Sequence, residues 1–503
     1  MSIQVRTALG VVAGVARDGV EIFRGIPFAK PLSGLGRIRA PEPVQAWGGV
    51  LDASQWAPAA PQEEIPLMGV GATGDNCLAL NIWRPSGASG RLPVMVWIHG
   101  GGFATGASHQ ALYEATALAA ENQVIVVSIN YRLGILGFGE WSAWPELQGV
   151  SNAGLRDQIL ALQWVQSHIE AFGGDPANVT VFGESAGGMS IACLLASPPA
   201  RGLFHRAILQ SGSPDHVVVR AEASRITARF VEVAGDARAC LEGGLEGIVK
   251  AQRACFAATV NRGLHEQAIP QFGMTLLPVI GDDILPEHPL DALRAGASAD
   301  IPVLLGTTMD EWTLFYLAPQ AMGRGQPRQE PDAERLAHEF ERTLPGRSAA
   351  MQARYQALMP DAAGSDVFCA YETDRMFRIP TIRLAEARFA AAAPTFHYLF
   401  DWPCAWNPRL GSCHVMEIPF VFGITDRPTG QFFTGGGEQA ARLSREMRAA
   451  WTSFARCGRP TGPGWPEWPA YGEKERATLM IAARTRRKDD PQAERRRLWT
   501  GIL

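Results

Sequence analysis

A serine placed between glycines is the first candidate for chemistry in this chain of 503 residues. Residues 179–182 form a short apolar run rich in β-branched side chains, and residues 186–196 have the pattern of a helix, so Ser185 stands at a turn between a strand and a helix. A serine hydroxyl becomes a useful nucleophile when a tight turn holds it toward a base, and small neighbours, here Gly183 and Gly187, permit such a turn. The pattern predicts a nucleophilic Ser185, and an incidental serine in a glycine-rich turn is the alternative.

Backbone amides beside this turn are candidates for stabilising an oxyanion. The turn leaves the amide of Ala186 at the N-terminus of the expected helix, where it has no acceptor within the helix. Residues 99–103, His-Gly-Gly-Gly-Phe, follow a strand expected at 94–98, and consecutive glycines let amides approach a ligand closely. We expect Gly101, Gly102 and Ala186 to form an oxyanion hole, with a merely flexible glycine loop as the alternative.

Strand-like runs alternate with longer helical patterns along the chain. This alternation predicts an α/β fold with a large, mostly parallel central sheet flanked by helices. The expected strands are residues 94–98, 124–129, 179–182, 207–209, 303–305 and 396–400. The clearest helix is expected at residues 154–172, ending at Gly173 and Gly174, and residues 58–66 and 319–331 are expected to be surface loops. Because no repeat or long linker divides the chain, residues 1–503 are expected to form a single domain.

Composition excludes several functional classes. The net charge is −4 and no block of Lys and Arg occurs, which argues against a nucleic-acid partner. The start of the chain lacks the pattern of a signal peptide, and no apolar stretch approaches about 18 residues, so we expect no membrane span and a cytoplasmic protein. Gly69, Gly71 and Gly74 match a dinucleotide-binding motif, but a proline-containing loop precedes them and a strand follows, so no such cofactor is expected.

Several ordered motifs resemble those of type-B carboxylesterases, the α/β-hydrolase family that includes cholinesterases and bacterial p-nitrobenzyl esterases. Beside the two glycine motifs, the similar segments are residues 23–31, 76–83, 129–138, 202–212, 306–311 and 418–423. The resemblance implies an α/β-hydrolase fold and a serine esterase that hydrolyses small-molecule esters through an acyl-enzyme. It also implies that neither a metal nor an organic cofactor is needed.

The resemblance supplies the two partners of the serine. It places the acid at Glu311 and the base at His414, and the chain order Ser185, Glu311, His414 is the order of α/β-hydrolases. Asp310 is a neighbouring competitor for the acid. Other histidines have structural interpretations: His168 within a helix, and His109, His265, His288 and His338 in polar surroundings.

The chain departs from the family pattern at three places. Ala60 stands where secreted members have a cysteine that pairs with the one at Cys77, so Cys77 is expected to be a free thiol. The loop of residues 60–77 has no Trp, the residue with which cholinesterases bind quaternary ammonium, so choline specificity is not expected. Trp312 follows the acid where the family usually has glycine.

Two other functions remain as alternatives. One is a catalytically silent binding protein on the same fold, although silent relatives lose members of the triad and this chain keeps all three. The other is hydrolysis of amides or carbamates at the same site. A metal site at Cys404, Cys413 and His414 is not expected, because their spacing matches no common zinc pattern. The sequence sets no oligomeric state.

Overall fold

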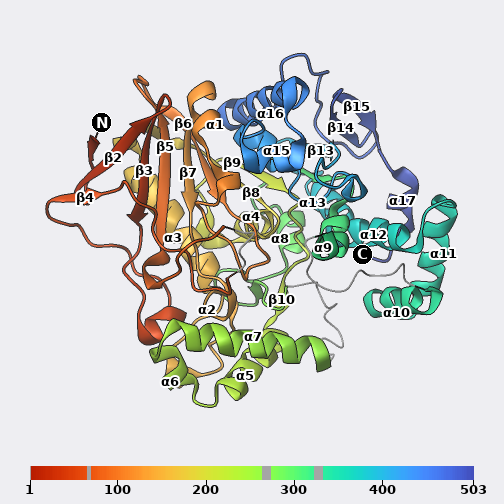
Figure 1. Ribbon diagram of the computed structural model, residues 1–503, viewed down its shortest axis with the longest axis horizontal. Helices are drawn as coiled ribbons and strands as arrows, with labels where there is room; N and C mark the ends of the chain where they lie inside the picture. Colours follow the sequence, from red (N-terminus) through yellow and green to blue (C-terminus); the bar gives the residue numbers. More distant parts are fainter. Residues whose placement is uncertain (1, 65–68, 263–273, 322–331) are drawn as a thin grey trace.

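A large twisted sheet dominates the computed structural model, which describes residues 2–64, 69–262, 274–321 and 332–503 (Figure 1). Within these residues the sheet has thirteen strands, of which β4 (Val50–Asp52) pairs only with β2. Along the sheet the other strands follow in the order β1 (Ser2–Arg6), β2 (Val11–Arg17), β3 (Val20–Pro27), β5 (Ala79–Pro85), β7 (Ile125–Ile129), β6 (Leu92–Ile98), β8 (Gly174–Glu184), β9 (Arg206–Gln210), β12 (Val303–Thr308), β13 (Thr395–Asp401), β14 (Ala477–Ala482) and β15 (Arg486–Asp489). A separate small sheet pairs β10 (Val218–Val219) with β11 (Val279–Ile280).

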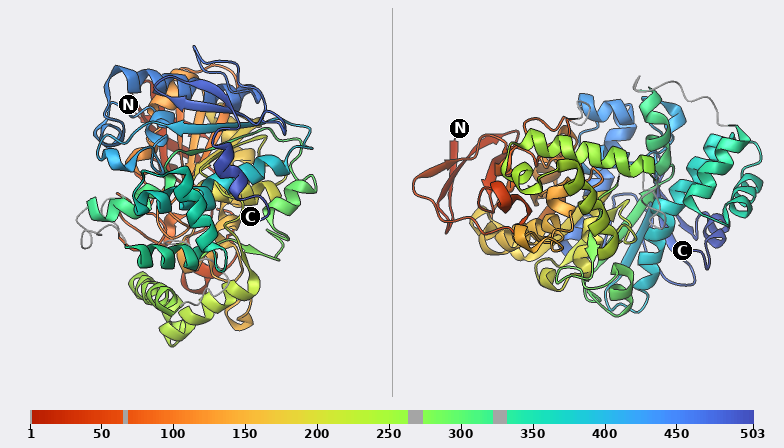
Figure 2. Two further views of the ribbon diagram at one scale, coloured as in Figure 1. Left: turned by 90° about the vertical axis from the view of Figure 1, so that its right-hand side faces the viewer. Right: turned by 90° about the horizontal axis from the view of Figure 1, so that it is seen from below.

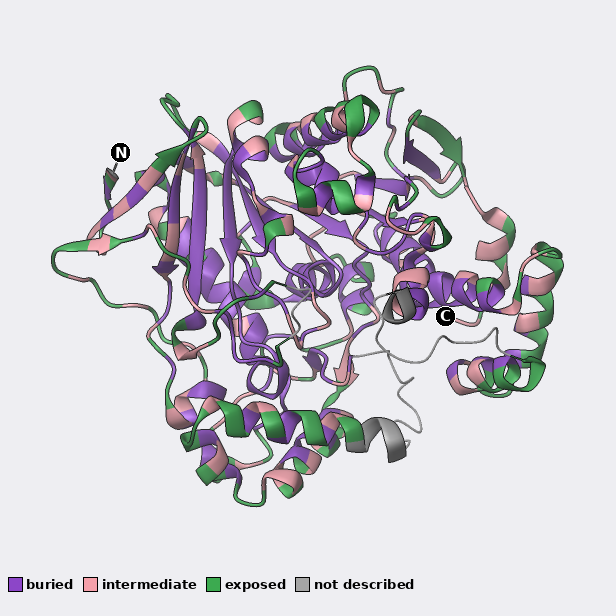
Figure 3. Cartoon of the chain, viewed as in Figure 1, coloured by how far each residue is buried: buried purple, intermediate pink, exposed green. Residues whose placement is uncertain are grey.

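The central strands of the large sheet are parallel, as expected, and its two sides are antiparallel. All pairs from β7 through β6, β8, β9, β12 and β13 to β14 are parallel. The pairs among β1, β2, β3, β5 and β7, and the pair of β14 with β15, are antiparallel. Strands β7, β12 and β14 are buried over their whole length, because helices cover a parallel sheet on both faces. The long strands of the sheet are mostly purple, the colour of buried residues, in Figure 3.

Two groups of helices pack against the strands that carry the candidate residues. Helices α3 (Ala153–His168) and α4 (Ala186–Ala196) contact each other and β8. Helices α1 (Thr116–Asn122) and α16 (Gly437–Cys457) contact each other; α1 also contacts β3, β5 and β7, and α16 contacts β6 and β8. Shorter helices join these elements: α2 (Gly134–Phe138), α8 (Pro289–Arg294), α9 (Glu311–Ala321), α13 (Ile379–Ala387), α14 (Ile418–Phe422), α15 (Pro428–Thr434) and α17 (Ala493–Leu498). In the described segments, no helix combines the length and the apolarity needed to cross a bilayer.

Two further helical groups lie outside the sheet. Helices α5 (Arg220–Ala234), α6 (Ala237–Glu242) and α7 (Leu245–Arg262) lie at the bottom of Figure 1. Helices α10 (Ala333–Thr343), α11 (Ser348–Leu358) and α12 (Gly364–Thr373) lie at the end of the molecule opposite the N-terminus (Figure 2). A π-helical stretch, Asp374–Arg378, joins α12 to α13 and carries Phe377 toward the candidate site.

Two predicted boundaries need correction. Helix α3 ends at His168, a 3₁₀ turn covers Ile169–Phe172, and Gly173 at φ 81° ends the turn, so that Gly174 already belongs to β8. The loop expected from Pro319 is wrong for its first three residues, because α9 continues to Ala321 while it packs against α12. Residues 322–331 of that loop, and residues 65–66 of the other expected loop, lie outside the described residues.

A buried ion pair connects the end of the central strand β7 to helix α3. Arg132 donates from Nε and Nη2 to the two carboxylate oxygens of Asp157 at 2.8 and 2.6 Å, and neither side chain is exposed. Arg132 also donates to the carbonyl oxygens of Arg37 and Arg39 at 3.0 and 2.6 Å. The paired charges therefore hold an N-terminal loop against the framework that carries the site.

Candidate active site

Ser185 lies at the sharp turn between β8 and α4, as the sequence indicates. The strand ends at Glu184, the helix begins at Ala186, and Ser185 has φ 55° and ψ −125°. Such backbone angles are strained for a residue with a side chain, and strain of this kind is typical of functional sites. The Ser185 amide donates to the Gln210 carbonyl at 2.9 Å, and its carbonyl accepts from the Met189 amide at 2.8 Å, so strand β9 and helix α4 fix the turn.

Glycines on both sides of the serine make this turn possible. A Cβ on Gly187 would stand 1.9 Å from the carbonyl oxygen of Ile98, and one on Gly183 would stand 2.7 Å from the same atom. Neither distance is compatible with a larger side chain, because backbone atoms surround both positions. Gly183 and Gly187 must therefore lack a side chain, because the end of strand β6 leaves no room for a Cβ atom at either position.

The glycine loop after β6 lies directly beside the serine. A Cβ on Gly100 would stand 3.1 Å from the Cβ of Ser185 and 2.8 Å from the carbonyl oxygen of Glu184. Gly101 and Gly102 have φ 110° and 61°, values that favour glycine. In the described part of the chain, the amides of Gly101, Gly102 and Ala186 have no hydrogen-bond acceptor. They are therefore available as donors to a ligand at Ser185.

His414 and Glu311 are joined by a short hydrogen bond. The Nδ1 atom of His414 lies 2.5 Å from Oε2 of Glu311, and both residues are buried. The other oxygen of Glu311 accepts from the Ser211 hydroxyl at 2.6 Å and from the Thr308 amide at 2.7 Å. These donors hold the carboxylate in place, so that it orients the imidazole. Asp310, the competitor in the sequence, instead accepts from the Ser412 amide at 2.9 Å.

The other nitrogen of His414 faces the serine turn. Nε2 lies 3.0 Å from Oε1 of Glu184, the residue before Ser185, without the alignment of a hydrogen bond. Burial lowers the pKa of His414, but the charges of Glu184 and Glu311 outweigh burial and raise this pKa well above its ordinary value. Burial acts in the opposite direction on the carboxyl group of Glu184. It raises the pKa of Glu184, and this effect exceeds the lowering effect of His414. Glu184 therefore competes with the Ser185 hydroxyl for Nε2 of His414, the nitrogen that must stay free if His414 is to accept the serine proton.

A third buried carboxyl group lies near these residues. Glu417 accepts hydrogen bonds from the Tyr398 hydroxyl at 3.2 Å and from Gln210 Nε2 at 3.4 Å. Burial, with the charges of Glu184 and Glu311, raises the pKa of Glu417 to about 8, so its protonated form predominates at neutral pH. The sequence argument missed Glu184 and Glu417, although one adjoins the candidate nucleophile and the other follows the candidate base by three positions.

Aromatic rings cover the candidate base. The Phe315 and Phe377 rings lie 5.0 and 4.8 Å from the imidazole of His414. Trp312, which the sequence marked as unusual, is buried with its ring 5.1 Å from Phe315, and its amide donates to the Thr373 hydroxyl at 3.0 Å. The large residue after the acid therefore anchors α9 to α12 and supports the apolar wall above His414.

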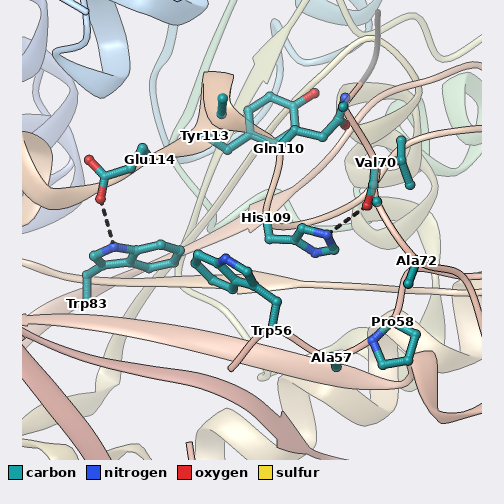
Figure 4. A pocket seen from close by; sticks show the side chains of 13 residues that line it. Trp56, Ala57, Pro58, Val70, Ala72, Trp83, His109, Gln110, Tyr113 and Glu114 are labelled. Carbon is teal, nitrogen blue, oxygen red and sulfur yellow. Dashed lines mark hydrogen bonds between the residues drawn. The ribbon is translucent and has the colours of Figure 1, made fainter. Parts of the chain in front are cut away.

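A pocket of about 570 Å³ is lined by Trp83 and by residues of the segments 56–58, 69–72 and 109–114 (Figure 4). Its rings include Trp56, Trp83 and His109, and the Trp56 ring is stacked on His109 at 5.6 Å. His109 has a polar partner, since its Nε2 lies 2.8 Å from the Val70 carbonyl oxygen, but the stacking of its ring on Trp56 was not expected from the sequence. His265 lies outside the described residues. Arg24 places its guanidinium 4.5 Å from the centre of the Trp56 ring, so a cation already occupies one face of this tryptophan.

Cys77 is a free thiol, as its missing partner at Ala60 predicted. The residue is fully buried, and burial raises the pKa of its thiol to about 12. The eight cysteines of the chain all lie in its described part, and no disulfide joins any two of them. The thiol at position 77 is therefore protonated and packs as a small apolar group.

Comparison with known proteins gives the class of the protein. The model of the carboxylesterase family matches residues 1–499, so this chain belongs to the carboxylesterase family. It is a carboxylic ester hydrolase, and its curated relatives are named accordingly. Para-nitrobenzyl esterase of Bacillus subtilis (strain 168) is 38% identical over 98% of this chain and 97% of the relative, and human cocaine esterase is 32% identical over 94% and 85%.

Solved structures agree with the fold. A thermophilic PNB esterase superposes with a TM-score of 0.85 at 36% identity, covering 98% of this chain and 99% of that one. A carboxylesterase of Geobacillus stearothermophilus, at pH 6.2, also has a TM-score of 0.85 at 34% identity, with 99% of each chain covered. The α/β-hydrolase fold expected from the sequence is thereby confirmed.

Proposed function

We propose that Ser185, His414 and Glu311 are the nucleophile, base and acid of a serine carboxylesterase that works through an acyl-enzyme. The observation that carries this proposal is the 2.5 Å contact between His414 Nδ1 and Glu311, which directs Nε2 toward the turn of Ser185. With Nδ1–H donated to the carboxylate, Nε2 is the basic nitrogen that accepts the serine proton.

The reaction then proceeds in two halves. Ser185 attacks the ester carbonyl while His414 takes its proton, and the amides of Gly101, Gly102 and Ala186 donate to the oxygen that becomes negative. His414 returns the proton to the leaving alcohol, which leaves an ester on Ser185. Water, deprotonated by His414, attacks this acyl-enzyme and releases the acid. Glu311 stabilises the imidazolium in both halves, and no metal or organic cofactor takes part.

We propose uncharged esters of short to medium acyl chain as substrates. The apolar rings of Phe315 and Phe377 beside His414 support this class, as does similarity to a para-nitrobenzyl esterase. Amide or carbamate hydrolysis would use the same groups, with a poorer leaving group. Rates on an ester, an amide and a carbamate of the same acyl group and similar size separate these activities, and we expect the ester to react fastest.

We propose further that residues 1–503 work as one domain and that the protein is cytoplasmic. One continuous core of buried side chains, with members from Val5 to Trp499, supports the first proposal. The buried thiol of Cys77 supports the second, because a reducing compartment preserves such groups. Limited proteolysis tests the first proposal, since a stable fragment that retains activity would contradict it, and cell fractionation tests the second.

Replacement of the nucleophile tests the proposed function. Ser185→Ala should lower kcat by roughly 10³- to 10⁶-fold, because only the oxyanion donors and substrate binding remain. Ser167→Ala, on an exposed position of α3, is the matched control and should keep normal turnover. Near-normal ester hydrolysis by the Ser185 variant would exclude the assignment.

A further inference from the structure

An ion pair joins helix α17 to the π-helical stretch that carries Phe377. Arg495 of α17 donates from Nε to Oδ2 of Asp374, the first residue of the stretch, at 2.7 Å. The Tyr355 hydroxyl donates to the same oxygen at 2.5 Å. The Asp374 side chain is fully buried, and 13% of the Arg495 side chain is exposed. Helix α17 therefore holds the beginning of the stretch through a charge-assisted hydrogen bond in the interior.

Further contacts fasten α17 to the neighbouring helices. Arg495 also donates from Nη2 to the Ala370 carbonyl of α12 at 2.5 Å. Trp499, directly after α17, donates from Nε1 to the Tyr355 hydroxyl at 2.7 Å, and its ring is stacked on Tyr371 with the ring centres 5.5 Å apart. Helix α17 also packs against α11 (Figure 1). These contacts give Arg495 a fixed place from which it reaches Asp374.

The π-helical stretch depends on side-chain contacts because its backbone is irregular. Pro380 follows the stretch, and its nitrogen carries no hydrogen to donate to the Met376 carbonyl four positions earlier. π-Helical turns within α-helices are rare and occur frequently at functional sites. The position of Phe377 is therefore fixed in part by the side chains on either side of it.

Arg378, at the other end of the stretch, connects it to the turn of the candidate acid. Its Nη1 lies 2.9 Å from Oδ1 of Asp374, and its Nη2 donates to the Met309 carbonyl at 2.7 Å. Met309 directly follows β12 and precedes Glu311 by two positions. One end of the stretch is thus held to α17 and the other end to the turn that carries Glu311.

Phe377 lies between these two attachments and packs on the candidate base. Its buried ring lies 4.8 Å from the imidazole of His414, and it is parallel to the Phe315 ring within 3° at 6.1 Å. Because side chains in a protein interior are closely packed, a shift of the stretch moves this ring relative to His414. The ring forms an apolar wall beside the base, where it contacts the part of an ester that does not react.

We propose that Arg495 positions the Phe377 ring against His414 by way of the ion pair with α17, and that this position sets the preference among acyl chains of different length. The inference rests on the proposed esterase reaction at Ser185. The alternative is that the ion pair only holds α17 in place and has no influence on which ester reacts.

Kinetics with p-nitrophenyl acetate, butyrate and hexanoate distinguish the two interpretations, because the leaving group is constant and only the acyl chain varies. One methylene in an apolar pocket is worth about tenfold or more in rate, so a displaced wall should change the ratio of kcat/KM between butyrate and acetate about 3- to 10-fold. We expect this change in Arg495→Gln, mainly through KM. In that variant Asp374 keeps Tyr355 and Arg378 as partners, so the protein should still fold.

Arg496→Gln is the matched control. Arg496 lies in the same helix and donates to both carboxylate oxygens of Asp490 at 2.9 and 2.7 Å. We expect this variant to keep the ratio of the wild type, whatever its melting temperature. A purely structural role of Arg495 would lower the melting temperature and the number of active sites, but it would leave KM and the ratio unchanged. An unchanged ratio in Arg495→Gln, or an equal change in Arg496→Gln, would overturn the proposal.

A double-mutant cycle tests whether Arg495 acts through Phe377. Phe377→Leu removes the ring but keeps an apolar side chain, and it should also change the ratio. If Arg495 acts through the ring, Arg495→Gln should change the ratio no further in the Phe377→Leu background. A further change in that background equal to the change in the wild-type background would overturn the proposal.

Titration of active sites with a fluorophosphonate separates this test from a failure of the proposed function. The wild type and each variant should take up one label per folded chain, on Ser185, and the kinetic constants are expressed per labelled site. A wild type without label on Ser185 would contradict the proposed function. Full labelling on Ser185 with an unchanged ratio in Arg495→Gln would contradict only the positioning role of Arg495.

Discussion

The Nε2 atom of His414 lies 3.0 Å from Oε1 of Glu184, the residue that immediately precedes Ser185. A carboxylate so close stabilises the imidazolium, which cannot accept a proton from serine. The pKa of His414 is accordingly raised well above its ordinary value, with burial acting in the opposite direction. The same contact that places the histidine beside the nucleophile therefore narrows the pH range in which it acts as a base.

Glu184→Gln should shift the pH dependence toward acid. In the wild type, kcat/KM should rise with pH through a midpoint above about 6.5, the ordinary pKa of histidine. Glutamine removes one negative charge near Nε2, so the imidazolium is less stable, its pKa falls and the acid limb moves to lower pH. Rate profiles of both proteins between pH 5 and 9 measure this shift, and an unmoved or raised midpoint would refute the influence of Glu184.

Two glycine-to-alanine substitutions should have opposite effects on stability, because Gly187 is closely packed beside the serine turn and Gly247 is not. Gly187→Ala would place a Cβ 1.9 Å from the Ile98 carbonyl oxygen, so we expect a loss of stability of about 1 to 3 kcal/mol or more and a near-complete loss of activity. Gly247→Ala in α7 meets no atom within 4 Å and should stabilise by up to about 1 kcal/mol. Thermal melting and ester turnover test both, and a stable, active Gly187 variant would contradict the model of the turn.

Removal of the negative charge of Asp157, which is paired with Arg132 in the interior, should destabilise the protein more than removal of an exposed charge. Asp157→Asn leaves the fully buried guanidinium without its counter-charge, and we expect the free energy of unfolding to fall by about 3 to 5 kcal/mol. Asp18→Asn removes the partner of Arg17 in an exposed pair and should change stability by less than about 1 kcal/mol. Urea unfolding measures both losses of stability. Equal losses would show that burial does not determine how much an ion pair contributes to the free energy of unfolding.

Choline should give no advantage as a leaving group. The loop of residues 60–77 contains no tryptophan, and Trp56 outside it already has the Arg24 guanidinium over one face. The missing attraction for a quaternary ammonium amounts to about 0.5 to 2 kcal/mol per ring. We expect kcat/KM for acetylcholine to lie below that for 3,3-dimethylbutyl acetate, its uncharged analogue, at one pH and ionic strength. A clear preference for the cation would reveal an aromatic site elsewhere.

The sequence predicted those features that local patterns determine. Helix α4 occupies residues 186–196 as expected, because the apolar run before Gly183 and the small residues after it leave few other arrangements. The six expected strands all lie in the parallel centre of the sheet, where continuous apolar runs indicate burial on both faces. The strand expected after Gly74 is β5, but its antiparallel pairing, the other strands of the two sides and the helix through Pro319 were missed, because packing against distant segments decides them.

The electrostatics of the site could not be read from the sequence in the same way. Glu184 and Glu311 belong to separate segments that only the folded sheet brings to His414, whereas Glu417 follows His414 by three positions. The pKa values of His414, Glu184 and Glu417 depend on burial and on the neighbouring charges, and neither the burial nor the full set of neighbours follows from the spacing of residues along the chain. The family resemblance supplied Glu311 and His414 as candidates, but it carried no signal that Glu184 faces the basic nitrogen.

Mass spectrometric mapping of a covalent label tests the central claim most directly. Serine hydrolases react with fluorophosphonates through the activated nucleophile, so the amount and position of the label report that residue. We expect one label per chain, on the tryptic peptide that contains Ser185, with loss of esterase activity in proportion to labelling. Complete inhibition with the label on another residue, or full labelling of the Ser185→Ala variant, would contradict the assignment of Ser185 as the nucleophile.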